Sequence, residues 1–141
     1  MKILVPTDGS ASALKAVRYA ARLCQALKEE SSITLISVHD DTALRYARHF
    51  VGKQAVGDYL REISEHDLAS ARKALDKAGV KHDMVILTGH IAEEIARTAK
   101  RGKFDLIVLG SKGRSAIKDL LIGSVAQRVA GMAQAPVVLV K

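Results

Sequence analysis

Short apolar runs alternate with stretches of helical periodicity along the whole chain. The first run, Lys2–Pro6, is continuous and β-branched, which is typical of a strand buried on both faces. After Ser10, which suits a helix N-cap, apolar residues recur every three or four positions and predict a helix. The other predicted strands are Ile33–Val38, Lys81–Leu87, Phe104–Leu109 and Pro136–Val140, and the other predicted helices are Gly57–Lys77, Ile91–Lys100 and Gly123–Ala133.

This succession of strands and helices predicts an α/β fold. Strands that alternate with helices form a parallel sheet covered by helices on both faces. We expect one open, five-stranded, Rossmann-like sheet with strand order 3-2-1-4-5, in a single domain over residues 1–141. The segment Asp40–Val56 exceeds the roughly 2–6 residues of an ordinary connection. Its spacing allows a short extra helix, and its length suits either a lid or partner surface or a tolerated insertion.

The strongest local signal follows the fourth predicted strand. Ligands of open parallel sheets bind beyond the carboxyl ends of the strands. There, Gly110 and Gly113 would allow φ > 0 and a close approach of the backbone to a ligand. Nine residues later, Gly123 and Ser124 open the last helix, whose first N–H groups and positive dipole end attract phosphate. One loop therefore has an anion-binding feature at each end: the glycines that follow the strand and the start of the last helix.

This glycine pattern resembles the nucleotide-binding signature of the universal stress protein family. The similarity extends over essentially the whole chain, from I-L-V-P-T-D-G-S through D-L-I-V-L-G-S-K-G-R to A-P-V-V-L-V-K. Members of that family that keep the glycines bind ATP, and members that lack them do not. The resemblance therefore implies a small stress-response or signalling protein that binds ATP or another adenine nucleotide, coupled to an unnamed protein partner or to assembly.

The resemblance also assigns individual positions. Asp8 would lie near the ribose, the phosphates and any nucleotide-bound Mg²⁺ or Mn²⁺. The backbone of Val38 would recognise the adenine edge, and Leu109 would lie beside the base. It implies no catalytic residue. The implied nucleotide-binding set is Pro6, Thr7, Asp8, Val38, Leu109, Gly110, Gly113, Arg114, Gly123, Ser124 and Val125.

An enzymatic alternative remains open, namely a slow metal-dependent ATPase. Phosphoryl transfer needs a metal, charge neutralisation and a group that orients water. Asp8 could hold the metal, and Lys112 or Arg114 could meet the phosphates, but no general base is evident. Neither Ser111 nor Ser115 has a visible His–Asp partner, so neither indicates a hydrolase.

The remaining chemistry-bearing side chains favour structural roles. The histidines lack metal-ligand spacing, although His39 and His90 follow strands at the predicted mouth, where surface or capping roles are favoured over ligand contact. Cys24 lies on the apolar side of the first helix and is expected in the core. The other histidines are His49, His66 and His82.

The charge balance raises a nucleic-acid hypothesis and the aromatic content weakens it. The chain has 22 Lys and Arg against 15 Asp and Glu, a net charge of +7. Basic residues cluster between Arg97 and Lys118, either as a solvated face or to attract an anionic ligand. With two Phe, three Tyr and no Trp, the chain offers no stacking platform in that cluster, so nucleic-acid binding is disfavoured.

Location and assembly follow from simpler features. One cysteine fits a reducing compartment, no apolar run approaches the ~20 residues that span a bilayer, and the N-terminus resembles no signal peptide. We therefore expect a cytoplasmic protein without a membrane partner.

Pro136–Val140 would be an apolar edge strand, which predicts a homodimer paired through that edge about a two-fold axis.

Overall fold

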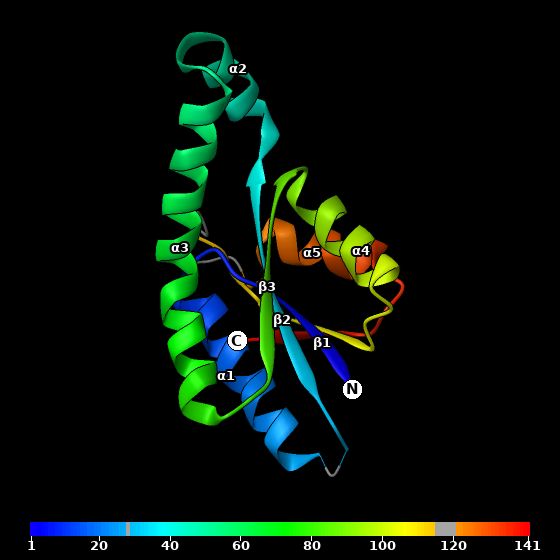
Figure 1. Ribbon diagram of the computed structural model, residues 1–141. Coiled ribbons are helices and arrows are strands. Elements are labelled where there is room, and N and C mark those ends of the chain that lie inside the picture. The colour runs from blue at the N-terminus through cyan, green and yellow to red at the C-terminus, as the bar shows by residue number, and fades with distance from the viewer. Residues whose placement is uncertain (28, 115–120) are drawn as a thin grey trace.

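The structure is a computed structural model that describes residues 1–27, 29–114 and 121–141. Strands and helices alternate along the chain, with one additional helix before the longest one (Figure 1). In chain order the elements are β1 (Lys2–Pro6), α1 (Ala11–Ala26), β2 (Ser32–Asp40), α2 (Asp41–Val51), α3 (Lys53–Ala78), β3 (His82–Gly89), α4 (Ile91–Arg101), β4 (Leu106–Gly110), α5 (Ser124–Met132) and β5 (Val137–Val140).

The five strands form one parallel sheet with the order β3-β2-β1-β4-β5, as predicted. β1 pairs with β2 up to Pro6↔Ile36, whereas β2 and β3 stay paired as far as Asp40↔Gly89. These two strands therefore extend beyond β1. The expected end of the second strand at Val38 is too early, because His39 and Asp40 still form ladder pairs. The ladder uses backbone groups, which an apolar side-chain pattern does not reveal.

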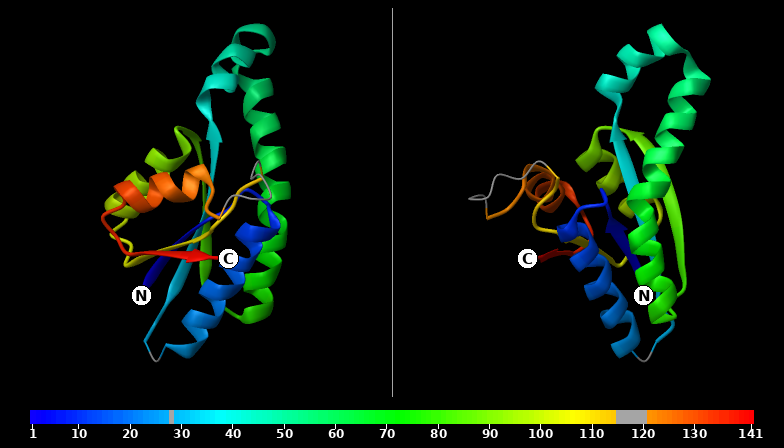
Figure 2. Two further views of the ribbon diagram at one scale, coloured as in Figure 1. Left: turned by 180° about the vertical axis from the view of Figure 1, so that it is seen from behind. Right: turned by 90° about the vertical axis from the view of Figure 1, so that its left-hand side faces the viewer.

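The sheet separates two apolar layers. Helices α1 and α3 cover one face, and α4 and α5 cover the other (Figure 2). Side chains alternate between the layers, so Ile3 and Val5 pack with α1 and α3 while Leu4 packs with α4 and α5. Because both faces are covered at the centre of the sheet, the central strands β1 and β4 are short continuous apolar runs in sequence.

Local signals set the helix ends. The Oγ of Ser10 accepts a 3.1 Å bond from the Ala13 N–H, and Gly79 adopts φ 66° at the end of α3, so the predicted N-cap and C-cap glycine are confirmed. β4 begins at Leu106, later than expected. The Phe104 N–H donates to the Ala99 carbonyl of α4, and this bond holds Phe104 at the helix end.

The long segment after β2 forms the predicted extra helix, α2. Gly52, with φ 83°, ends it, and α3 then begins at Lys53 rather than Gly57. Together α2 and the first turns of α3 project beyond the sheet (Figure 1). This hairpin leaves Tyr46 and Phe50 about three-quarters exposed, with their rings 5.4 Å apart. Among the described residues, no helix is both long and apolar enough to cross a membrane.

Candidate functional site

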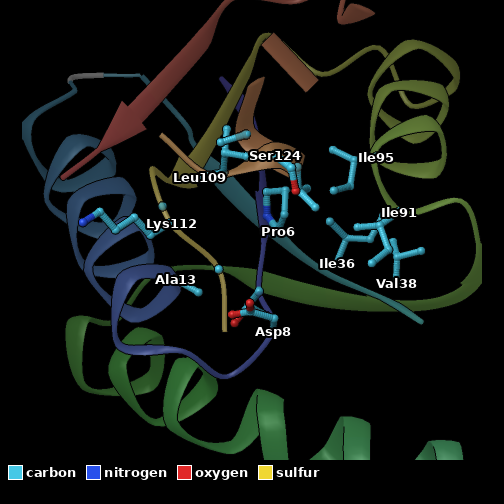
Figure 3. A pocket seen from close by; sticks show the side chains of 16 residues that line it. Pro6, Asp8, Ala13, Ile36, Val38, Ile91, Ile95, Leu109, Lys112 and Ser124 are labelled. Atoms are coloured by element: carbon cyan, nitrogen blue, oxygen red, sulfur yellow. The ribbon is translucent and has the colours of Figure 1, made fainter. Parts of the chain in front are cut away.

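A cleft lies at the carboxyl ends of the strands, where the chain order reverses between β1 and β4. Its volume is about 190 Å³, far above the roughly 10–15 Å³ that one water needs, so it can hold a ligand. Figure 3 shows the side chains converging from the sheet, α1, α4 and α5. The lining residues are Pro6, Thr7, Asp8, Ala13, Ile36, Val38, Ile91, Ile95, Leu109, Gly110, Lys112, Gly113, Gly123, Ser124, Val125 and Ala126.

The structure brings the whole predicted set except Arg114 into the lining of this cleft. Lys112, raised for the enzymatic alternative, also lines it. The apolar positions that sequence reasoning missed are Ala13, Ile36, Ile91, Ile95 and Ala126. A signal for most of them exists: Ile36 shares a strand face with Val38, and Ile91 and Ile95 lie one helical turn apart. The sequence pattern does not single them out, because a cleft wall and a core face have the same periodicity.

The cleft has a polar end and an apolar end (Figure 3). Ile36, Val38, Ile91 and Ile95 from β2 and α4 gather at the apolar end, Asp8 lies at the opposite end, and Ser124 lies between Leu109 and Ile95. Gly113 lies beside Asp8, since a Cβ there would approach the Asp8 carboxylate. Such a cleft suits a ligand with an apolar body and an anionic or strongly polar tail.

Asp8 joins the turns that follow β1 and β4. Its Oδ1 accepts a 2.9 Å bond from the Ser10 N–H, and its Oδ2 accepts a 3.0 Å bond from the Arg114 N–H. Thr7 anchors the same turn, since its N–H donates to the Ile36 carbonyl at 2.9 Å. The carboxylate therefore lies at a fixed position, and it keeps lone pairs for a ligand.

The loop glycines are needed for space rather than for a left-handed backbone. The glycines with positive φ among the described residues are Gly9, Gly52, Gly79 and Gly89, so the expectation of φ > 0 at Gly110 and Gly113 was wrong. A Cβ on Gly110 would lie 2.5 Å from the Ser12 Oγ and 2.7 Å from its backbone. α1 and β4 touch at this point, and only a missing side chain permits the contact. A Cβ on Gly113 would lie 3.3 Å from the Asp8 Oδ2, at the edge of the cleft.

The start of α5 faces the cleft. Gly123 is its N-cap with φ −72°, and the Gly123 N–H donates to the Ser111 carbonyl at 2.6 Å. No side chain of the described residues caps this helix, and its first residues, Ser124 to Ala126, line the cleft. The first-turn N–H groups and the positive dipole end therefore point toward the site.

Behind the polar end lies an ion pair between Arg114 and Asp67 of α3. The Arg114 guanidinium donates to the Asp67 Oδ1, and the Asp67 side chain is 5% exposed while that of Arg114 is 56% exposed. Gly9 packs against the pair, since a Cβ there would lie 2.8 Å from the Asp67 Oδ1. Arg114 thus borders the site through its backbone while its side chain extends to α3.

The histidines lie outside the cleft lining. His39 binds Ser64 of α3 through its Nε2 at 2.6 Å and Ser37 at 3.2 Å. Burial lowers the pKa of His39, Asp67 opposes that shift, and Arg114 adds to it. His90 precedes α4 and makes no side-chain capping bond there. The described residues contain no group of three or more His, Cys, Asp and Glu side chains arranged for a metal.

The remaining candidates have structural surroundings. Cys24, on α1, packs against the core as expected, and burial raises the pKa of its thiol. Ser111 is buried, and its N–H donates to the Val140 carbonyl at 2.9 Å. Of the basic cluster, Arg97 pairs with Glu94. Ser115 and Lys118 lie outside the described residues.

Fold and site together define a class: a doubly wound α/β protein with a two-ended ligand cleft at the switch point of its sheet. Comparison with known families gives the particular assignment. The chain belongs to the Universal stress protein family, whose model matches residues 1–141.

Individual relatives agree with this assignment. The chain is 35% identical to universal stress protein MJ0531 of Methanocaldococcus jannaschii, over 99% of this chain and 81% of that protein. It is 31% identical to universal stress protein YxiE of Bacillus subtilis, over 99% and 98% of the two chains. Each alignment spans nearly this whole chain.

Solved structures give the same result. The structure of protein MJ0577 from Methanocaldococcus jannaschii superposes with a TM-score of 0.86 at 28% identity, covering 99% of this chain and 94% of that one. A universal stress protein in complex with cAMP superposes with a TM-score of 0.67 at 25% identity, covering 100% and 97% of the two chains.

Proposed function

We propose that this chain is a small stress-response or signalling protein that binds ATP or another adenine nucleotide in the cleft. The observation that carries the proposal is the two-ended cleft, with an apolar end beside β2 and α4 and an anion-binding end at the start of α5. The related protein bound to cAMP supports an adenine nucleotide as the ligand.

The proposed nucleotide lies along the cleft. Its base packs between Val38 and Leu109, and the Val38 backbone reads the adenine edge. Its phosphates meet the N–H groups at Ser124 and Val125 and the Ser124 hydroxyl. Pro6, Thr7 and Asp8 surround the ribose, and Gly110, Gly113 and Gly123 keep the backbone close to the ligand.

A divalent ion would accompany the phosphates. Mg²⁺ usually binds through one or two carboxylates together with substrate phosphates and waters. The lining contains one carboxylate among its described residues, Asp8. This donor set fits an ion that arrives with the nucleotide, with Asp8 as its protein contact, and does not form a cage of its own.

Occupancy is coupled to assembly through β5 in this proposal. β5 is an edge of the sheet, and its four residues are half-buried in the single chain. Ser111, beside the glycines of the cleft, donates its N–H to the carbonyl of Val140 at the end of β5. A change in the loop would therefore reach the edge strand through one hydrogen bond.

The single cysteine is consistent with action in a reducing cytoplasm.

Calorimetric titration of the purified chain with Mg-ATP, cAMP and Mg-GTP tests the nucleotide proposal. We expect ATP or cAMP to bind and GTP to bind at least about tenfold more weakly, equivalent to about 1.4 kcal/mol. Gly113→Val should reduce adenine-nucleotide affinity by at least about tenfold, because its branched side chain would enter the phosphate end near Asp8.

Gly131→Val is the matched control. Gly131 lies on α5, and a Cβ there would meet nothing within 4 Å, so the same substitution should leave binding unchanged. Equal affinities of Gly113→Val and the wild type would refute the placement of the phosphates, and the absence of binding by any adenine nucleotide would refute the function.

A further inference from the structure

The Arg114–Asp67 ion pair lies where it can control the charge of the proposed phosphate end. The Arg114 N–H binds the Asp8 carboxylate, and the preceding residue, Gly113, lines the cleft. The Arg114 side chain nevertheless turns away from the cleft and donates to Asp67 on α3. A guanidinium is the side chain best suited to phosphate, so its orientation at this position matters for an anionic ligand.

Backbone bonds independent of the ion pair hold the described part of the loop. The loop backbone is held by the Lys112 N–H on the Ser12 Oγ at 3.3 Å, the Ser111 N–H on the Val140 carbonyl at 2.9 Å and the Gly123 N–H on the Ser111 carbonyl at 2.6 Å. Arg114 adds its own backbone bond to Asp8. These bonds of the described part of the loop involve neither the guanidinium nor Asp67.

Because Asp67 is nearly buried, its carboxylate binds the Arg114 guanidinium strongly. The Asp67 side chain is nearly buried, with His66 Nδ1 3.8 Å from its Oδ1. A buried carboxylate that loses its cation is heavily penalised, whereas the half-exposed guanidinium is free of that penalty. This penalty favours the Arg114–Asp67 pair over a contact between Arg114 and a phosphate that keeps its own water.

We propose that Asp67 is a positioning residue that sets phosphate specificity: it holds the Arg114 guanidinium off the phosphate end of the cleft. This proposal rests on the proposed nucleotide function and adds a residue that limits affinity for highly charged nucleotides. Removing the Asp67 charge releases Arg114, which then binds the phosphate nearest the loop. The gain grows with the number of phosphates and is absent for a ligand without them.

The test is a titration of Mg-ATP, Mg-ADP, AMP and adenosine into the wild type and Asp67→Asn. We expect Asp67→Asn to bind ATP about tenfold more tightly, as one charge-assisted hydrogen bond would give, with a smaller gain for ADP and none for adenosine. The gain should shrink as salt is raised, because the freed guanidinium is exposed. Adding Arg114→Gln to Asp67→Asn should abolish it.

Asp58→Asn is the matched control, because Asp58 lies exposed on the same helix and its loss changes the net charge equally. Unchanged ATP affinity in Asp67→Asn, or an equal loss for all four ligands, would overturn the proposal, the latter because it indicates a purely structural role. A wild type that binds none of the four ligands would instead refute the proposed function.

A measurement on the wild type covers the case in which Asp67→Asn does not fold. The NMR signal of the Arg114 Nε–Hε group should stay in place when ATP is added, while the Gly113 backbone amide shifts. A large movement of the Arg114 side-chain signal would show that the guanidinium already binds phosphate with Asp67 present, which contradicts the proposal.

Discussion

At the scale of single residues, side chains around the site are held in place by contacts with residues that are distant in the sequence. His39 follows Val38 on β2, so the two side chains point to opposite faces of the sheet. Val38 lines the cleft, whereas His39 binds Ser64 on α3. The end of β2 therefore contributes Val38 to the wall of the cleft and His39 to a hydrogen bond with α3.

This placement of His39 predicts a pH-dependent stability. Burial lowers its pKa from the ordinary 6.5, so the unfolded chain binds a proton more readily than the folded one. The free energy of unfolding should therefore fall as the pH drops below about 6.5 and level off below the folded pKa. Urea unfolding between pH 8 and pH 5 measures this slope.

His39→Gln should flatten the slope, because the titrating group is gone. His49→Gln, on the projecting hairpin, removes a histidine from an exposed position and should keep it. A slope that is the same in His39→Gln and the wild type would assign the pH dependence to other groups.

At the scale of elements, β5 is the strand through which we propose that the chain assembles. The carbonyl of Pro136 accepts a bond from the N–H of Ile107 on β4, and the carbonyl of Val140 accepts one from Ser111, the residue after β4. Because the N–H and C=O of a strand residue point the same way and alternate along the strand, the backbone of Val138 also faces β4. The groups of Val137 and Leu139 therefore face outward, where a second copy would pair.

Leu139→Pro should convert the proposed dimer to a monomer, because it removes an outward donor without breaking the β4–β5 ladder. Leu139→Ala, which keeps the donor, is the control and should remain dimeric. Light scattering at micromolar concentration should give about twice 15.2 kDa for the wild type and the control, and about 15.2 kDa for Leu139→Pro. A monomeric wild type, or a dimeric Leu139→Pro, would exclude this interface.

At the scale of the whole molecule, the cleft joins segments from most of the chain. Its walls come from the turn after β1, the middle of the sheet, α4 and the start of α5. Among the described lining residues Asp8 is the one carboxylate and no histidine is present. Both Asp8 oxygens already accept backbone bonds, so Asp8 is better placed to hold an ion than to take a proton from water.

We therefore expect at most slow ATP hydrolysis. Phosphate release with Mg²⁺ or Mn²⁺ should be at least about a hundredfold below the enzyme median of roughly 10 per second. Any such slow release should fall further in Asp8→Asn, because the ion loses its protein contact. A metal-dependent rate near the median would reverse this conclusion and favour the enzymatic alternative.

The sequence by itself determined the sheet, its order and most of the cleft. Continuous apolar runs between helical periods specify strands buried on both faces, and residues that directly follow such strands meet at one edge. The predicted glycines Gly110, Gly113 and Gly123 all line the cleft, although Gly110 is required by its contact with Ser12 rather than by positive φ. These features are local or topological, so a linear pattern contains them.

Only the tertiary structure decided which groups pair across the chain. The side chains of Asp67 and Arg114 lie 47 positions apart in sequence, and His39 and Ser64 lie 25 apart, yet both contacts connect α3 to segments that border the cleft. The continuation of β2 to Asp40 depends on backbone pairing with β3, and the outward direction of Leu139 depends on its register with β4. Ion pairs, hydrogen bonds and register depend on distance and direction in space, which the polarity of a residue does not specify.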